Sequence, residues 1–284
     1  MSRALLIVVG AVALLPAASL DNGLGRVPYM GFSSWFAGLT LGSESGCVSD
    51  AFFNETADAF VSTGLRDAGF DILGIDCYWT SARDPATGDW VPDSSIFKGG
   101  LAGYEAVVEH VRAAGMRVWG YTDRGTALCS GVNGTGSLGR EAADAAWFVA
   151  RGVSFVKEDS CAASDDHEVA FAEYARFRDG LNATGVPILF NLCGWNPFYA
   201  PVGHALANSW RIGPDAAQWS TILVNLDFSS QVWQFAGPGG FNDLDMLGGC
   251  TVFGPMSSQQ RRAQFVAYAM AASPPQNRET NGYG

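Results

Sequence analysis

Carboxylate side chains follow several short apolar runs of the sequence. They are Asp76, Asp123, Asp159, Asp215, Asp243 and Asp245, and Lys157 and Arg211 lie among them. Hydrolysis of a glycosidic bond needs one carboxyl group as acid and a second as nucleophile or base. An aspartate after a strand can also cap the next helix, which explains any single one equally well. The set favours glycoside hydrolysis, because Lys157 points to the same side of a strand as Asp159 and would hold that carboxylate ionised.

Other chemistries find less support in the sequence. His110, His167 and His204 have no metal-ligand spacing, and no Cys-x-x-Cys pair occurs. The oxygen-rich segment Asn242–Asp245 is the alternative, since such loops also bind Mg or Ca. We nevertheless expect no metal and no cofactor. Lys and Arg number 17 against 28 Asp and Glu, giving a net charge of −11 without a basic block, so we expect no nucleic-acid partner.

Strand-length apolar runs alternate with helical patterns along the chain. Gly69, Gly115, Gly152 and Gly185 each end a helical pattern, where a left-handed residue is needed, and an apolar run follows each. Runs of this kind are typical of parallel strands buried on both faces, so the protein is of the α/β class. An open doubly wound sheet and a (β/α)8 TIM barrel both fit. No Gly-x-Gly-x-x-Gly follows the first strand, and a barrel gathers the strand-end polar residues on one face, so we predict the barrel.

The N-terminus has the features of a targeting segment. Arg3 precedes the apolar run Ala4–Leu15, which is too short to span a bilayer, and Pro16–Ser19 forms a small-residue cleavage site. Residues 1–19 are therefore predicted to be a signal peptide, with an uncleaved anchor as the alternative. Sequons at Asn54, Asn133 and Asn182 and an even number of cysteines agree with the secretory pathway. We expect an extracellular, lysosomal or vacuolar glycoprotein with no membrane span in the mature chain.

Blocks of sequence also match a known family in chain order. They are Val27–Trp35, Ile75–Trp79, Gly120–Gly125, Lys157–Cys161, Leu192–Trp195, Asn208–Arg211 and, most specifically, Gly237–Leu247. With these blocks the chain resembles the α-galactosidase / α-N-acetylgalactosaminidase family of retaining glycosidases (glycoside hydrolase family 27, melibiase-like). The resemblance covers residues 25–273, which would form the catalytic barrel.

The resemblance implies a role for each matching residue. Asp159 matches the nucleophile and Asp215 the acid/base of a double displacement, in which the two carboxyl groups lie about 5–5.5 Å apart. Asp215 should hold its proton longer, so we expect it to lie near less positive charge or to be more desolvated than Asp159. The matching sugar-binding positions are Trp35, Asp76, Cys77, Tyr121, Lys157, Gly194, Trp195, Arg211 and Asp245. The resemblance also implies a disulfide between Cys129 and Cys161, with Cys47 and Cys77 as a second candidate pair.

Two departures from the family pattern leave the sugar open. Cys77 replaces the second of two adjacent aspartates, which we attribute to a one-residue shift of a disulfide cysteine. Gly194 replaces a glutamate that contacts the 2-hydroxyl, and we expect it to open space there. The expected activity is hydrolysis of terminal α-galactosyl residues of oligosaccharides, glycolipids or glycoproteins, with a homodimer as a compatible assembly. The alternatives are an α-N-acetylgalactosaminidase or related α-glycosidase, and a catalytically weak sugar-binding homologue.

The end of the chain is expected to leave the barrel incomplete. A seventh strand near Asp243–Leu247 is followed by a predicted helix over Ser257–Ala272. The tail, residues 274–284, is polar and contains prolines, so it is not expected to form a buried parallel strand. We therefore predict a barrel truncated after its seventh strand and helix, without the family's C-terminal β-sandwich. Such a chain should fold poorly because its sheet edges stay unpaired.

Overall fold

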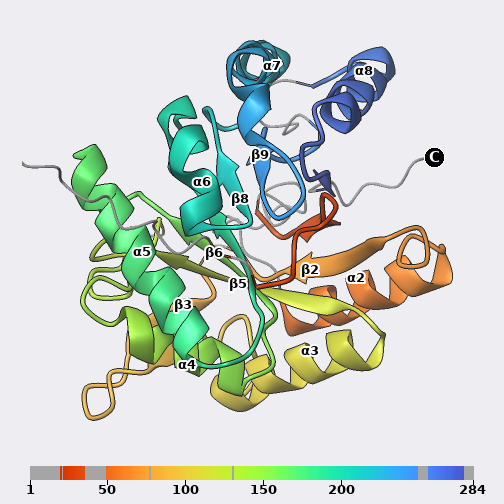
Figure 1. Cartoon of the computed structure of the whole chain (residues 1–284). Coiled ribbons are helices and arrows are strands. Elements are labelled where there is room, and N and C mark those ends of the chain that lie inside the picture. Colours follow the sequence, from red (N-terminus) through yellow and green to blue (C-terminus); the bar gives the residue numbers. More distant parts are fainter. Residues whose placement is uncertain are drawn as a thin grey trace, which may run out of the picture.

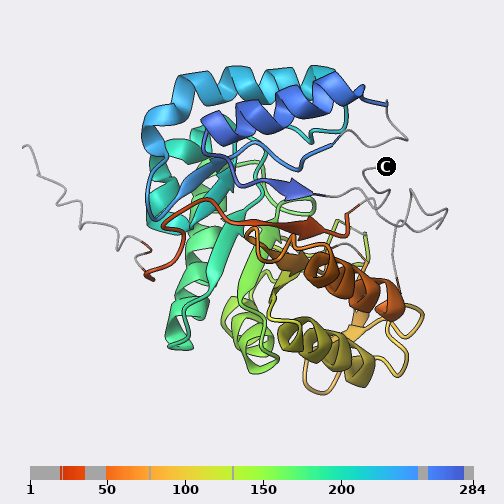
Figure 2. The same cartoon turned by 90° about the vertical axis from the view of Figure 1, so that its right-hand side faces the viewer.

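A parallel β-sheet surrounded by helices makes up the body of the protein (Figures 1 and 2). The computed structural model describes residue 20 and residues 22–35, 49–76, 78–129, 131–248 and 255–277. The predicted signal peptide, residues 1–19, and both Cys47 and Cys77 lie outside the described residues.

The main sheet has eight strands in the order β10-β1-β2-β5-β6-β7-β8-β9, and every neighbouring pair is parallel. The strands are β1 (Met30–Ser33), β2 (Phe70–Gly74), β5 (Arg117–Asp123), β6 (Phe155–Asp159), β7 (Leu189–Leu192), β8 (Ser209–Arg211), β9 (Phe241–Asp243) and β10 (Gln276–Asn277). Beyond β9, the amide of Leu247 donates to the carbonyl of Gln276 at 2.7 Å, and Leu247 forms a parallel bridge with Asn277. These contacts bring the two ends of the sheet together as in a (β/α)8 barrel.

Helices follow the strands and cover the outer face of the sheet (Figure 2). They are α2 (Asp50–Ser62), α3 (Leu101–Ala113), α4 (Glu141–Ala150), α5 (His167–Ala183), α6 (Ala200–Leu206), α7 (Trp219–Val232) and α8 (Ser258–Met270), with 3-10 turns η1 (Pro197–Tyr199) and η2 (Trp233–Phe235). Strands β3 (Thr80–Arg83) and β4 (Trp90–Pro92) form a separate antiparallel pair. The glycines predicted to end helical patterns have the expected left-handed backbone, with φ of 100° at Gly69 and 74° at Gly115.

The prediction that the tail cannot form a buried parallel strand is wrong. Residues Gln276 and Asn277 pair with β1, and the amide of Gly31 donates to the carbonyl of Pro275 at 3.2 Å. Pro275 lies outside the strand and supplies only its carbonyl, so its missing N–H costs nothing there. Burial of Gln276 is tolerated because its side-chain amide donates to the Tyr29 hydroxyl at 3.2 Å and to Asp243 Oδ2 at 3.4 Å.

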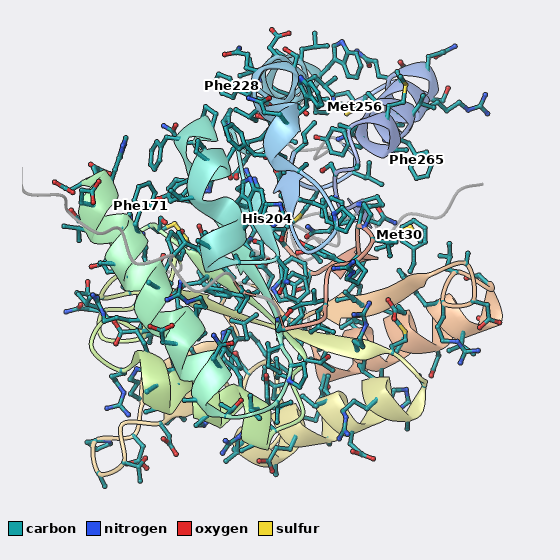
Figure 3. All side chains as sticks on the ribbon, in the orientation of Figure 1. Met30, Phe171, His204, Phe228, Met256 and Phe265 are labelled. Carbon is teal, nitrogen blue, oxygen red and sulfur yellow. A yellow bond between two sulfur atoms is a disulfide. The ribbon has the colours of Figure 1, made fainter. Side chains whose placement is uncertain are left out.

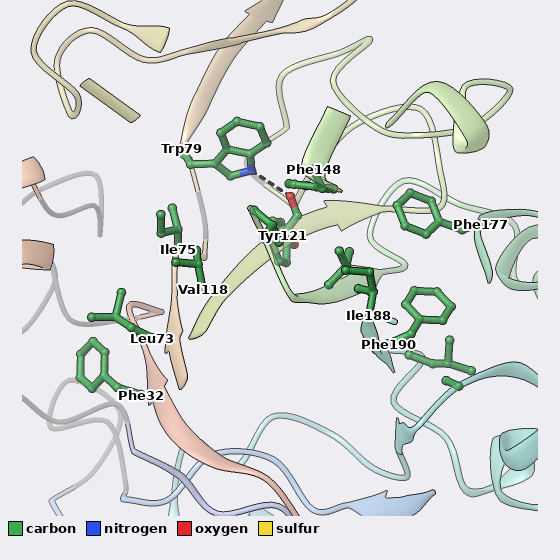
Figure 4. Packing of buried hydrophobic residues seen from close by; sticks show 14 of the residues in the cluster. Phe32, Leu73, Ile75, Trp79, Val118, Tyr121, Phe148, Phe177, Ile188 and Phe190 are labelled. Atoms are coloured by element: carbon green, nitrogen blue, oxygen red, sulfur yellow. Dashed lines mark hydrogen bonds between the residues drawn. The ribbon is translucent and has the colours of Figure 1, made fainter. Parts of the chain in front are cut away.

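Apolar side chains form a separate cluster on each face of the sheet. Side chains on the outer face meet the helices, and Figure 4 shows Leu73, Val118, Phe148 and Phe190 in this layer. Figure 3 shows side chains of the helices and of the sheet projecting toward one another. A second, smaller cluster lies on the inner face, formed by Tyr29, Ile72, Trp119, Phe155, Leu189 and Met246. Among the residues described, no helix combines the length and apolar character needed to cross a membrane.

The inner face of the barrel is layered because alternate residues of each strand point inward. Trp119, Phe155 and Leu189 are register partners and form an apolar floor. Two residues further along the same strands, Tyr121, Lys157 and Asn191 form the next layer. Above them, Asp123 pairs with Asp159. The strands thus place polar groups on an apolar base at their carboxyl ends.

Candidate active site

A cavity of about 210 Å³ opens at the carboxyl ends of the strands. It is lined by Trp35, Asp76, Tyr121, Cys129, Lys157, Asp159, Cys161, Cys193, Trp195, Arg211, Asp215, Asp245 and Met246. The structure therefore brings together the residues to which the family resemblance gives a role in catalysis or sugar binding, with two exceptions. Gly194 is not on the cavity wall, and Cys77 lies outside the described residues.

Asp159 ends strand β6 and is held on three sides. Its Oδ2 accepts the hydroxyl proton of Tyr121 at 2.9 Å, its Oδ1 accepts the amide of Ser160 at 3.0 Å, and Lys157 Nζ lies 3.8 Å from Oδ2. Burial raises the pKa of this carboxyl, and Lys157 and the Cys193 side chain counteract that effect. The carboxyl group is thus fixed in orientation and largely removed from solvent.

Lys157 also joins Asp159 to a second carboxylate. Its Nζ lies 3.2 Å from Asp76 Oδ2, which accepts the Ser33 hydroxyl at 3.1 Å as well. Burial lowers the pKa of Lys157, but the charges of Asp76, Cys193 and Asp159 outweigh this effect. The pKa of Lys157 therefore lies well above its ordinary value. The ammonium therefore stays charged between the two acids and can hold both as hydrogen-bond acceptors.

Arg211 organises the opposite wall. Its Nη2 donates to Asp215 Oδ1 at 3.0 Å, and its Nη1 lies 3.0 Å from Asp245 Oδ1 and 3.5 Å from Cys193 Sγ. Asp245 Oδ2 accepts the amide of Ala216 at 2.6 Å, which ties the loop that carries Asp215 to Asp245. The guanidinium is only 3% exposed, whereas the Asp215 side chain is 50% exposed.

The expected environments of the two carboxylates are therefore reversed. Asp215 was expected to have less positive charge nearby or more desolvation than Asp159. Instead it is half-exposed and paired with Arg211, and Asp159 is the desolvated member. The physical reason is position: Asp159 ends a strand inside the barrel, whereas Asp215 lies on the loop after β8.

Backbone strain marks two residues of the cavity wall. Trp195 and Asp245 have φ of 56° and 78°, in the left-handed region that non-glycine residues rarely adopt. Such conformations persist where surrounding contacts enforce them, as the Arg211 ion pair and the Ala216 amide do for Asp245. Both residues contribute to the cavity wall.

Asp243 supports the site from below instead of facing the cavity. Its Oδ1 accepts the amide of Asp245 at 2.8 Å, and its Oδ2 accepts Asn191 Nδ2 at 2.9 Å as well as the Gln276 amide. Asn242, the first candidate ligand of the alternative metal site on Asn242–Asp245, is already engaged. Its Oδ1 accepts a hydrogen bond from the indole N–H of Trp210 at 2.6 Å. These side chains are committed to positioning Asp245 and packing the sheet.

Comparison with known proteins fits this geometry. The family model Melibiase_2, described as alpha galactosidase A, matches residues 28–277. The chain belongs to the melibiase family. A probable alpha-galactosidase of Dictyostelium discoideum is 34% identical over 271 residues, covering 94% of this chain and 66% of that protein. An alpha-galactosidase of Oryza sativa is 34% identical over 263 residues, covering 90% of this chain and 58% of that protein.

Solved structures of melibiase relatives share the fold. The alpha-galactosidase of Saccharomyces cerevisiae has a TM-score of 0.77 at 30% identity, over 92% of this chain and 60% of the yeast chain. Alpha-galactosidase I of Mortierella vinacea has a TM-score of 0.78 at 27% identity, over 91% of this chain and 68% of that chain. The (β/α)8 barrel is thereby confirmed. The chain spans 58% to 66% of the length of the two curated relatives described above.

Gly194 does not open space in this member of the melibiase family. A Cβ built there would lie 2.7 Å from the hydroxyl oxygen of Tyr199 and closer still to its ring carbons. Tyr199 is 2% exposed, so its ring fills the space that a side chain at residue 194 would take. The expectation that Gly194 makes room for a larger sugar substituent is wrong, because η1 carries Tyr199 back over this position.

The Cys129–Cys161 disulfide is present and confirms that expectation. It joins the loops after β5 and β6, and both cysteines line the cavity. The predicted Cys47–Cys77 pair lies outside the described residues. Asn133 and Asn182 are exposed and Asn54 is half-buried, and their glycosylation stays a prediction.

Cys193 and Met246 are cavity residues that the sequence argument did not assign. Both directly neighbour predicted residues, since Cys193 precedes Gly194 and Met246 follows Asp245. That adjacency to a strand-end motif is the signal that would have included them.

Proposed function

We propose that this chain carries the catalytic barrel of a retaining α-glycosidase that hydrolyses terminal α-galactosyl residues. The observation that carries the proposal is one cavity with two differently placed carboxylates, Asp159 and Asp215. Asp159 is buried beside Tyr121 and Lys157, whereas Asp215 is half-exposed to solvent and forms an ion pair with Arg211. The alpha-galactosidase names of the relatives support the same choice of reaction.

The first step forms a covalent intermediate. An oxygen of Asp159 attacks the anomeric carbon, and the bond from that carbon to the leaving oxygen breaks as Asp215 donates its proton to that oxygen. Tyr121 and Lys157 hold Asp159 in the orientation for attack. The fixed geometry lowers the entropy cost of bringing the two reacting atoms together.

The second step releases the sugar with the starting anomeric configuration. Asp215, now ionised, takes a proton from water, and the oxygen of that water attacks the anomeric carbon and displaces Asp159. The half-exposed position of Asp215 gives water a path to this carboxylate. Arg211 holds Asp215 in place through both steps.

The sugar is proposed to be galactose without a 2-acetamido group. Asp76, Lys157, Arg211 and Asp245 supply charged groups for its hydroxyls, and Trp35 and Trp195 supply apolar walls. The Tyr199 ring fills the space behind Gly194, which speaks against the α-N-acetylgalactosaminidase alternative. Oligosaccharides such as the raffinose named with the yeast structure, glycolipids and glycoproteins are the proposed substrates. A secretory location and a homodimer complete the proposal.

A panel of p-nitrophenyl α-glycosides tests this function. The α-galactoside should be hydrolysed, and proton NMR of the early product should show the α-anomer. The Asp159→Asn and Asp215→Asn variants are the matched controls and should be inactive on the same substrate. Hydrolysis of only the 2-acetamido substrate would overturn the sugar assignment. Sugar binding without any turnover would favour the weak sugar-binding homologue.

A further inference from the structure

Asp123 is a buried carboxylate that stands next to Asp159 but outside the cavity wall. It ends strand β5 and is the register partner of Asp159 on β6. Side-chain oxygens of the two lie within 4.8 Å of each other, and both residues are buried. Two carboxylates this close in a desolvated place resist being ionised together. The two carboxyl groups are therefore expected to hold one proton between them.

Asp123 also holds the turn that follows Asp159. Its Oδ2 accepts the amide of Cys161 at 2.6 Å, and its Oδ1 accepts the amide of Gly125 at 2.7 Å. The amide of Ser160, the residue between Asp159 and Cys161, donates to Asp159 Oδ1. The turn after the nucleophile is thus held by both carboxylates at once.

The cation near this pair belongs to Asp159. Lys157 Nζ lies 3.8 Å from Asp159 Oδ2, whereas no ion pair reaches Asp123 within the parts of the chain that the structure describes. The neighbouring guanidinium of Arg124 is bound instead by Glu173 and by the carbonyl of Ser164.

Two further titratable groups lie around Asp123, and burial raises the pKa of each, which favours their uncharged forms. Tyr121 shares strand β5 with it, and Glu158 of β6 interacts with it electrostatically. Burial and the charge of Asp159 raise the pKa of Asp123 to about 7, although backbone N–H groups lower it. The proton of the pair therefore resides on Asp123, and the negative charge on Asp159.

We propose that Asp123 is a positioning residue that carries a proton while Asp159 is ionised and loses it when Asp159 becomes the glycosyl ester. This inference rests on the proposed function, because it takes Asp159 as the nucleophile. As the bond from Asp159 to the anomeric carbon forms, the negative charge beside Asp123 disappears, and the Asp123 proton passes to solvent. Hydrolysis of the ester restores the charge of Asp159, and Asp123 takes up a proton again.

Trapping of the glycosyl-enzyme measures this proton. A 5-fluoro-galactosyl fluoride loses fluoride, and any proton that Asp215 gives up on labelling reaches the solvent equally in the wild type and in Asp123→Asn. With a pH indicator in weak buffer at pH 6, the wild-type chain should release most of one additional proton per labelled site, since Asp123 is mostly protonated one unit below its pKa of about 7. The Asp123→Asn variant should label without that additional release. Equal release by both proteins, or none by the wild type, would overturn the proposal.

A carboxyl NMR titration tests the pair without turnover. With carbon-13 in the aspartate side chains, Asp123 should titrate near neutral pH in the wild type. In Asp159→Asn its pKa should fall by about one unit or more, because the neighbouring charge is gone. An unmoved Asp123 titration in a folded Asp159→Asn chain contradicts the coupling. If the wild type neither labels nor hydrolyses galactosides, the proposed function fails and this titration still decides whether the pair is coupled.

Discussion

Glu158 is a fully buried acid on the outer face of strand β6, and it should make the fold less stable as pH rises. Its side chain is 0% exposed, and neither carboxyl oxygen has a hydrogen-bond partner among the residues that the structure describes. Burial is the main reason that its pKa lies well above the ordinary value, and Asp123 and Glu141 raise it further. The charge of Arg124 lowers that pKa, but its guanidinium pairs with Glu173 instead.

The sign of the effect follows from proton linkage. The folded state holds the Glu158 proton at a higher pH than the unfolded state, whose glutamate has a pKa of about 4.3. The stabilisation from this protonated form is present below that pH and is lost as pH rises toward the raised folded value. Within this window the free energy of unfolding falls by about 1.4 kcal/mol per pH unit from this one group.

Two substitutions separate charge from packing. In Glu158→Gln the group cannot ionise, so the pH-dependent loss should vanish while the shape stays. In Glu158→Leu the unpaired polar group is removed as well, and burying one costs about 1–3 kcal/mol. At pH 7 both variants should therefore be more stable than the wild type, and Glu158→Leu should exceed Glu158→Gln by about 1–3 kcal/mol.

Urea unfolding followed by tryptophan fluorescence at pH 4.5 and pH 7 measures these differences. The gap between wild type and Glu158→Gln should be small at pH 4.5 and several-fold larger at pH 7. Because the other buried acids are common to both proteins, the difference isolates Glu158. Parallel stability curves for the two proteins across this range would refute the reasoning.

Three further predictions concern the site. Asp159→Asn should lower kcat by more than about a thousandfold in a folded protein, since an amide cannot form the ester; near-normal kcat would remove it from the mechanism. Gly194→Ala should destabilise by about 1–3 kcal/mol through overpacking against Tyr199, and adding Tyr199→Leu should recover most of the loss in urea unfolding. The Cys129–Cys161 bond closes a loop of sequence separation 32, so its removal should cost about 3–4 kcal/mol. Unreduced peptide maps should show this linkage, and alkylation of Cys129 in the native protein would contradict it.

Most of the site could be predicted because it is built from strand ends. Each of Asp76, Tyr121, Asp159 and Arg211 belongs to a local run of apolar residues followed by polar ones. Once the runs are recognised as parallel strands, barrel geometry alone brings their ends together. The strand alternation also places Lys157 and Asp159 on one side without any knowledge of their partners.

The features that could not be predicted depend on contacts between distant segments. Gln276 becomes a strand residue because Tyr29 and Asp243, far away in sequence, bind its side chain. In isolation a polar residue after prolines is typical of a loop. Likewise, nothing near Gly194 in a one-dimensional pattern indicates that the Tyr199 ring fills its side-chain space.

Strand β6 shows how one short segment can serve two kinds of chemistry. Its inward residues, Lys157 and Asp159, form an ion pair with each other, and Asp159 also accepts a hydrogen bond from Tyr121. These contacts stabilise the charged forms of both side chains at the cavity. Its outward residue, Glu158, has no such partner among the residues described, and burial favours its protonated form. Asp123 lies between these extremes, since it has backbone donors but forms no ion pair within the described part of the chain. The three acids differ in partners more than in burial. Their protonation states should therefore respond to changes at neighbouring residues. Neutralising Asp159 should lower the pKa of Asp123 by more than it lowers the pKa of Glu158.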